Sequence, residues 1–210
     1  MTKIISFSLW GHDPKYTVGA IRNSELAKEI YPGWTCRFYL GDEVSPGVSD
    51  KLLKNGSEVV VNLGDSGWNG LFWRFFAADD QDCIMISRDT DSRLNPREKA
   101  AVDEWLASDK DFHIMRDHPH HRTEILGGMW GCRNGILSNM REMTADYKKG
   151  EYDNEYQVDQ NFLRDIIYPI VKDKTMVHDE FFEKKPFPTS RLNPQDFVGQ
   201  SYDENEGPQF

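Results

Sequence analysis

Residues 83–93, CIMISRDTDSR, decide the fold. Five residues suited to a short buried strand are followed at once by two aspartates, Asp89 and Asp91, with an arginine on each side. In an extended or turning segment, residues two apart project to the same side, so both carboxylates can meet one hard cation. A solvated acidic turn is the alternative. The position after an apolar strand, beside Arg88 and Arg93, favours a metal-bound phosphate.

Strand-like and helix-like segments alternate on both sides of this stretch. Paired glycines, Gly127 and Gly128, interrupt one apolar strand and predict a close approach of the backbone to a neighbouring element or a ligand. Asn95 is the predicted N-cap of a helix that starts at Pro96. We expect strands over residues 3–10, 35–40, 58–63, 83–87, 112–115, 125–131 and 174–178, and helices over residues 15–31, 68–78, from 96 onward, and from a cap at Asp153 or Asn154 to about 168. The pattern predicts a single α/β domain with a Rossmann-like, mostly parallel sheet flanked by helices and ligands at the carboxyl ends of the strands.

Charge and cysteine usage narrow the class of protein. With 25 Lys and Arg against 35 Asp and Glu, the net charge is −10, which disfavours nucleic acid and anionic membranes as partners. An anionic ligand would need a metal ion or a local cluster of basic side chains. Three scattered cysteines (Cys36, Cys83 and Cys132) and the lack of a signal-like or membrane-spanning apolar run predict a cytoplasmic protein with reduced thiols.

A strand followed by Asp-x-Asp after a Rossmann-like start resembles the GT-A glycosyltransferases. In that family the motif holds a divalent ion on the diphosphate of a nucleotide sugar. The stretch ISRDTDSRLNPREKAAVDEW…FHIMRDHPHH…ILGGMWG, within residues 86–131, looks like a chlorella-virus group of such enzymes that glycosylate the major capsid protein. The resemblance covers essentially the whole chain. It implies a GT-A domain over residues 1–187 and a protein located in the cytoplasm of a virus-infected host. The C-terminal acidic segment, 188–210, is expected to be a frayed end or a linker to further domains.

Two further matches are to family-eight retaining glycosyltransferases. His178, followed by the sequence Lys-Lys-Pro-Phe at residues 184–187, is similar to a segment that supplies a third metal ligand and a diphosphate-contacting lysine. The resemblance implies Mn²⁺, with Mg²⁺ second, on Asp89, Asp91 and His178, and leaves Lys184 and Lys185 open as the equivalent lysine. The alternative for His178 is a hydrogen-bonded histidine at a strand end.

Asp159 and Gln160 resemble the Asp-Gln pair that lies near the donor sugar and reaction centre in the same enzymes. This match favours transfer with retention of configuration, although polar residues in a first helical turn are also ordinary caps. If the linkage were inverted, Asp117 or Asp159 would be the general base.

The nucleotide is expected near the ends of the first strands. The resemblance points to Ser8, Leu9 and Trp10 for the base, and to Asp42 or Asp65 for ribose or the uracil imide. Arg74 and Arg88 are candidates for the phosphates, and an exposed Arg74 paired with Asp79 or Asp80 is an equal alternative. 

The loop over residues 116–122 contains three histidines. No cysteine stands at a suitable spacing and adjacent His120 and His121 point apart in most conformations, so a zinc site is disfavoured. Asp117, His118 and His120 are candidates for sugar or acceptor hydroxyls, together with Gly127, Gly128 and the ring face of Trp130.

Together these features predict transfer of a hexose or 6-deoxyhexose, such as glucose or rhamnose, from a UDP-sugar to a hydroxyl of a glycan or glycoprotein. A non-enzymatic sugar-binding or capsid-assembly module is the alternative. A metal-dependent phosphohydrolase of the haloacid-dehalogenase type is disfavoured, because that family places its aspartate after the first strand and has Thr or Val where this chain has Arg93.

Overall fold

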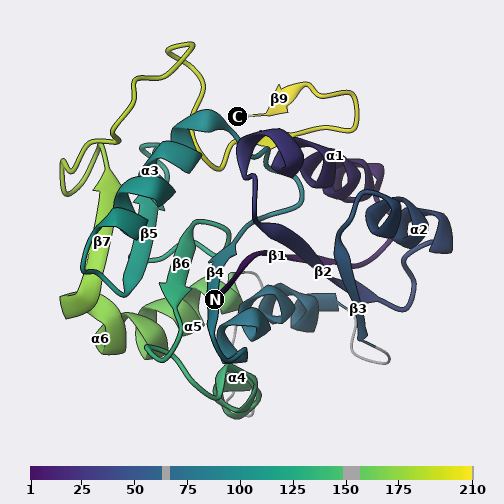
Figure 1. The fold of residues 1–210 in the computed structure, drawn as a ribbon, viewed down its shortest axis with the longest axis horizontal. Helices are drawn as coiled ribbons and strands as arrows, with labels where there is room; N and C mark the ends of the chain where they lie inside the picture. Colours follow the sequence, from purple (N-terminus) through teal and green to yellow (C-terminus); the bar gives the residue numbers. More distant parts are fainter. Residues whose placement is uncertain (63–66, 149–156, 210) are drawn as a thin grey trace.

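A computed structural model describes residues 1–62, 67–148 and 157–209, and a central sheet runs through them (Figure 1). Within the described residues this sheet has seven strands in the order β3-β2-β1-β4-β6-β5-β7. β6 is antiparallel to β4 and β5, and the other pairs are parallel. The predicted mostly parallel sheet is confirmed. The strands are β1 (Thr2–Leu9), β2 (Thr35–Gly41), β3 (Glu58–Asn62), β4 (Cys83–Ser87), β5 (Phe112–Arg116), β6 (Trp130–Arg133) and β7 (Thr175–Asp179).

Three helices on one face of the sheet begin with a proline in the first turn. They are α1 (Pro14–Ile30), α2 (Pro46–Lys54) and α3 (Pro96–Ala107). The side chain of Asn95 accepts a hydrogen bond from the Glu98 backbone N–H at 3.0 Å, which confirms the predicted start of α3. The helix α2 was not predicted from the sequence, because it is short and its Pro46-Gly47 start is typical of a turn.

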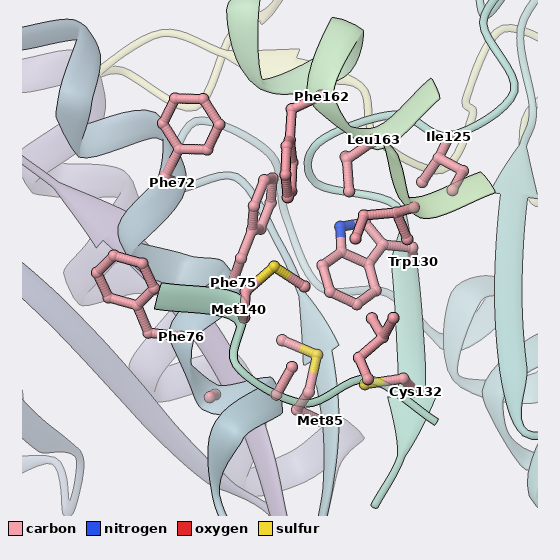
Figure 2. Packing of buried hydrophobic residues seen from close by; sticks show 14 of the residues in the cluster. Phe72, Phe75, Phe76, Met85, Ile125, Trp130, Cys132, Met140, Phe162 and Leu163 are labelled. Atoms are coloured by element: carbon pink, nitrogen blue, oxygen red, sulfur yellow. The ribbon is translucent and has the colours of Figure 1, made fainter. Parts of the chain in front are cut away.

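The alternation of β4 divides the core into two layers. Ile84 and Ile86 pack with α1, α2 and α3, whereas Cys83 and Met85 face the other side of the sheet. That second layer contains a 3₁₀ helix, η1 (Gly67–Asp79), whose Phe72 and Phe75 lie 5.7 and 6.4 Å from the ring of Phe162 (Figure 2). Its remaining helical elements are α4 (Met140–Lys148), α5 (Val158–Phe162), η2 (Leu163–Ile167), α6 (Tyr168–Val171) and η3 (Lys172–Lys174).

Three local expectations need correction or fall outside the structure. Ile166 continues the apolar periodicity of the helix predicted to about residue 168 and would face inward in a regular α-helix, but it is 37% exposed, because η2 is a π turn and so changes the phase of the helix. The predicted strand over residues 125–131 starts only at Trp130, and the residues before it form a loop. The predicted cap at Asp153 or Asn154 lies outside the described residues.

The C-terminal segment packs on the Asp-x-Asp loop. Strands β8 (Ser201–Tyr202) and β9 (Pro208–Gln209) form a hairpin, which Figure 1 shows beside the start of α1. The backbone N–H of Tyr202 donates to the carbonyl of Asp91 at 2.8 Å, and Arg93 pairs with Glu206 at 2.8 Å. The expected frayed end is therefore wrong for this segment. Among the described helices, none has the length and apolar character needed to cross a bilayer.

Candidate functional site

A cavity of about 570 Å³ opens at the carboxyl ends of β1 and β4. These two strands are neighbours and run parallel, so the residues that follow them meet at one edge of the sheet. The predicted residues that line this cavity are Ser8, Leu9, Trp10, Arg74, Asp89 and Asp91. The start of α1 adds His12, Asp13 and Tyr16, and η1 adds Trp68 and Leu71, none of which were predicted as site residues.

A second cavity of about 210 Å³ shares part of its wall with the first. Trp68, Leu71, Arg74 and Asp89 line both cavities, so the two adjoin at the first aspartate of the motif. Asp159, Gln160 and Gly127, all predicted, line the smaller cavity. Its other lining residues are His121, Leu126, Met129, Gln157 and Gly199.

Arg74 lies in the wall that the two cavities share. Its side chain is 6% exposed and bridges two carboxylates, donating to Asp89 Oδ1 at 2.5 Å and to Asp159 Oδ2 at 2.8 Å. The alternative of an exposed Arg74 paired with Asp79 or Asp80 is wrong. Asp79 instead accepts from the first backbone N–H groups of α4, and Asp80 pairs with Arg37.

The surroundings of the site's carboxylates favour the binding of a cation. Burial raises the pKa of the Asp91 carboxyl, the charge of Asp89 raises it further, and the Lys15 ammonium at 3.0 Å opposes both. Burial also raises the pKa of Asp159, and the charge of Arg74 opposes this shift. Each aspartate of the motif thus has a cationic partner, and together they present the oxygen ligands that Mn²⁺ or Mg²⁺ takes. Among the described residues no group of three His, Cys, Asp or Glu side chains can hold a metal by itself, so a cation here would need oxygens from a bound ligand.

The paired glycines confirm the predicted close approach. A β-carbon on Gly127 would overlap the Arg74 guanidinium and the Asp159 carboxylate, and one on Gly128 would overlap the carboxylate of Asp89. Neither glycine has a positive φ, so the requirement is for space and not for a left-handed backbone. The glycines let the β5–β6 loop lie directly against the charged side chains.

His178 does not join Asp89 and Asp91. Its ring is 3% exposed, its Nδ1 lies 2.8 Å from Nε2 of His113, and its Nε2 lies 3.5 Å from Glu104. The three-ligand metal set is therefore corrected, and the alternative of a hydrogen-bonded strand-end histidine is the arrangement found. Lys184 and Lys185 are exposed, Lys185 pairs with Glu183, and neither lysine lines the two cavities.

Arg88 and Trp130 belong to the core. Arg88 is 1% exposed and donates to Glu98 on α3 at 3.2 Å. Its side chain lies on the α3 face of the sheet, whereas η1, which lines the cavities, lies on the other face. Trp130 is fully buried and stacks on Phe112 at 5.3 Å. Neither side chain can contact a ligand as predicted.

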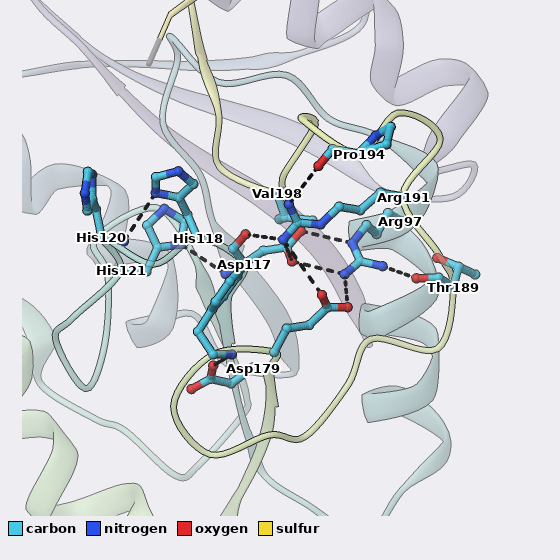
Figure 3. A network of polar contacts seen from close by, with 12 residues as sticks. Arg97, Asp117, His118, His120, His121, Asp179, Thr189, Arg191, Pro194 and Val198 are labelled. Atoms are coloured by element: carbon cyan, nitrogen blue, oxygen red, sulfur yellow. Dashed lines mark hydrogen bonds and ion pairs between the residues drawn. The ribbon is translucent and has the colours of Figure 1, made fainter.

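The polar loop after β5 begins with Asp117, whose buried carboxylate accepts hydrogen bonds from several parts of the chain (Figure 3). Asp117 is fully buried and accepts two bonds from Arg97, at 2.9 and 3.0 Å, one from Arg191 and one from the Val198 backbone N–H, both at 2.9 Å. A catalytic role for Asp117 is therefore not supported by its position. His118 packs on Phe197 at 4.4 Å and His120 is exposed, and neither lines the two cavities.

Two nucleotide candidates remain, Asp42 and Asp65. Asp42 is exposed and lines neither cavity, and Asp65 lies outside the described residues. Two further residues of the site, His121 and Lys15, were also missed, because they carry no local signal in the sequence. His121 follows another histidine, and Lys15 follows a turn-like stretch at the start of a helix, so only packing distinguishes them.

Comparison with known proteins identifies the architecture. No protein-family model matches this chain, and no curated protein does either. Glucosyl-3-phosphoglycerate synthase from Mycobacterium tuberculosis is similar in structure, with a TM-score of 0.51 at 12% identity over 92% of this chain and 74% of that one. The same enzyme solved with Mn²⁺, UDP-glucose and phosphoglyceric acid gives 0.51 at 13% identity over 92% and 72%, and with Mg²⁺ and UDP 0.50 at 14% over 92% and 72%. The described part of the chain forms a mostly parallel seven-stranded sheet flanked by helices, which is the GT-A fold of those neighbours.

Proposed function

We propose that this protein transfers a sugar from a UDP-sugar to a hydroxyl group in a reaction that depends on a divalent metal. The observation that carries the proposal is the position of Asp89 and Asp91, which line one cavity at the carboxyl ends of β1 and β4. Asp89 also lines the adjoining cavity with Asp159 and Gln160. A solved structure with the same fold contains Mn²⁺ and UDP-glucose, which supports this choice of ligands.

The larger cavity suits the nucleotide. Ser8 and Leu9 end β1, and the rings of Trp10, Tyr16 and Trp68 offer faces for a base. Lys15 and Arg74, which contact the two aspartates, are the cations placed to meet a diphosphate. Arg74 was itself a predicted phosphate ligand, and Lys15 takes the role predicted for Arg88, Lys184 and Lys185.

Asp89 and Asp91 would hold the metal through their carboxylate oxygens. When bound, Mn²⁺ or Mg²⁺ neutralises the negative charge that forms on the departing UDP. Lys15 and Arg74 add positive charge beside it, so the departing diphosphate is stabilised from more than one side. These local positive charges offset the repulsion between the net charge of −10 and an anionic substrate.

Asp159 and Gln160 line the smaller cavity, in which we propose that the donor sugar binds. Arg74 orients the Asp159 carboxylate by a 2.8 Å bond, so a negative group faces the site where an oxocarbenium-like sugar would form. This position supports retention of configuration. Should an NMR analysis of the product show inversion, Asp159 becomes the general base, since the oxygens of Asp117 are already bonded.

The sugar and acceptor follow from the resemblance of residues 86–131. We propose a hexose or 6-deoxyhexose, such as glucose or rhamnose, and a glycan hydroxyl on a viral capsid glycoprotein in the host cytoplasm. A panel of UDP-sugars, screened for thermal stabilisation with Mn²⁺, identifies the donor.

Calorimetry with UDP and Mn²⁺ tests the metal site. Asp91→Asn and Asp89→Asn should each weaken Mn²⁺-dependent UDP binding at least about tenfold, which corresponds to about 1.4 kcal/mol. Asp42→Asn, an exposed carboxylate outside both cavities, is the matched control and should bind as wild type. Unchanged affinity in both motif variants would sink the proposal. Release of UDP from the UDP-sugar with Mn²⁺ and no acceptor distinguishes an enzyme from a binding module.

A further inference from the structure

His121, in the loop between β5 and β6, is the histidine that reaches the smaller cavity. Gly127, Asp159 and Gln160 line the same space. The cavity volume of about 210 Å³ equals that of about seven water molecules, which is the scale of one sugar ring.

The ring of His121 has a defined orientation and tautomer. Its Nδ1 accepts a hydrogen bond from the backbone N–H of Asp117 at 3.0 Å, so the ring proton is on Nε2. Asp117 is itself held by Arg97 and Arg191, and Phe197 packs edge-on against the imidazole at 5.7 Å. Burial, and after it the charge of His118, lower the pKa of His121 to about 4, so the ring is neutral near pH 7.

This tautomer limits what His121 can do. The Asp117 amide cannot give up its proton, so Nδ1 is occupied as an acceptor and Nε2 already carries a hydrogen. Neither nitrogen can serve as a general base. No other described residue bonds to Nε2, which leaves one N–H donor available to a ligand.

We infer that His121 donates its Nε2–H to a hydroxyl oxygen of the donor sugar and so selects sugars that carry that hydroxyl. The inference deepens the proposed function and rests on it. The donor ring is the chosen occupant, because the smaller cavity joins the larger one at Asp89, where the diphosphate would end. A site that pairs a hydroxyl discriminates against an analogue without it, since the site's polar group is then left unpaired.

Two substitutions separate sugar recognition from support of the loop. His121→Asn keeps an acceptor near the position of Nδ1 and removes the donor at Nε2, whereas His121→Gln places an amide donor near Nε2 and gives up the acceptor. Calorimetry with Mn²⁺ would compare UDP with whichever of UDP-glucose, UDP-galactose and UDP-rhamnose binds more tightly than UDP. His120→Asn, an exposed neighbour outside both cavities, is the control.

Sugar recognition predicts a specific pattern. His121→Asn should lose about tenfold in affinity for the UDP-sugar while its affinity for UDP stays unchanged, and His121→Gln should recover most of that loss. The inference is overturned if His121→Asn binds the UDP-sugar as wild type does, or if only His121→Gln loses affinity together with stability. It is also overturned if wild type binds no UDP-sugar more tightly than UDP, although the nucleotide site would then stand. If wild type does not bind UDP with Mn²⁺ at all, the proposed function fails as well.

Discussion

Two clusters of aspartate and arginine lie at the carboxyl ends of the sheet, and they differ in how far their hydrogen bonds are satisfied. The first, which we call the open cluster, comprises Asp89, Asp159 and Arg74 between the two cavities. The second, the sealed cluster, comprises Asp117, Arg97 and Arg191 (Figure 3). The Asp89 side chain is 41% exposed, whereas that of Asp117 is fully buried.

The comparison shows that residue type alone does not mark a ligand site. Both oxygens of Asp117 accept bonds from within the chain, including one from the Val198 backbone, so no acceptor capacity is left for a ligand. Asp89 bonds one arginine and keeps part of its carboxylate open to both cavities. A buried pair without free bonding capacity supports the fold, and a partly exposed pair beside a cavity can exchange partners.

The largest expected effect comes from breaking the sealed cluster. Asp117→Ala leaves Arg97 and Arg191 without this buried partner, and the free energy of unfolding should fall by about 3–5 kcal/mol. Urea denaturation followed by circular dichroism measures this loss. Asp42→Ala, at an exposed position, should change stability by less than about 0.5 kcal/mol. If Asp117→Ala were fully stable yet unable to bind UDP with Mn²⁺, Asp117 would act in ligand binding and not in support of the fold.

Acid should destabilise the region between the clusters through His121. Its pKa is about 4 in the folded chain against about 6.5 when unfolded, so the unfolded chain binds more protons between these values. The stabilisation is present above pH 6.5 and is lost as the pH falls toward 4, by at most about 3 kcal/mol. As the pH falls through this range, the free energy of unfolding should therefore decrease more steeply for wild type than for His121→Asn. His113 and His178, whose pKa values burial also lowers, act equally in both proteins, and parallel curves would contradict the assignment.

A smaller effect is expected where the glycines meet the open cluster. In Gly128→Ala the new methyl group must displace the Asp89 carboxylate, which should cost about 1–3 kcal/mol of stability and weaken Mn²⁺-dependent UDP binding. Thermal unfolding and calorimetry measure the two effects. Gly47→Ala is the control, since its β-carbon would make only an ordinary contact at 3.7 Å. Wild-type binding by Gly128→Ala would show that the loop does not position Asp89.

Much of the fold could be predicted because local patterns agreed with the final packing. The run CIMIS is a strand whose alternate side chains enter both core layers, and Asn95 caps α3 as its sequence indicates. The elements that were missed have weak local patterns. The helix α2 starts with turn-like residues, and the π turn at η2 exposes Ile166 in a segment that otherwise has helical periodicity.

The sequence by itself determined the strand before Asp89 and Asp91, the alternation of strands and helices, and the need for glycines beside the site. These features depend on neighbouring residues and on steric rules that hold along a short segment. Only the tertiary structure decided that Arg74 bridges Asp89 and Asp159, that Asp117 is sealed, and that His121 instead of His120 reaches a cavity. The reason is physical: whether a charged or polar side chain is free to bind depends on its burial and on partners far away in the chain.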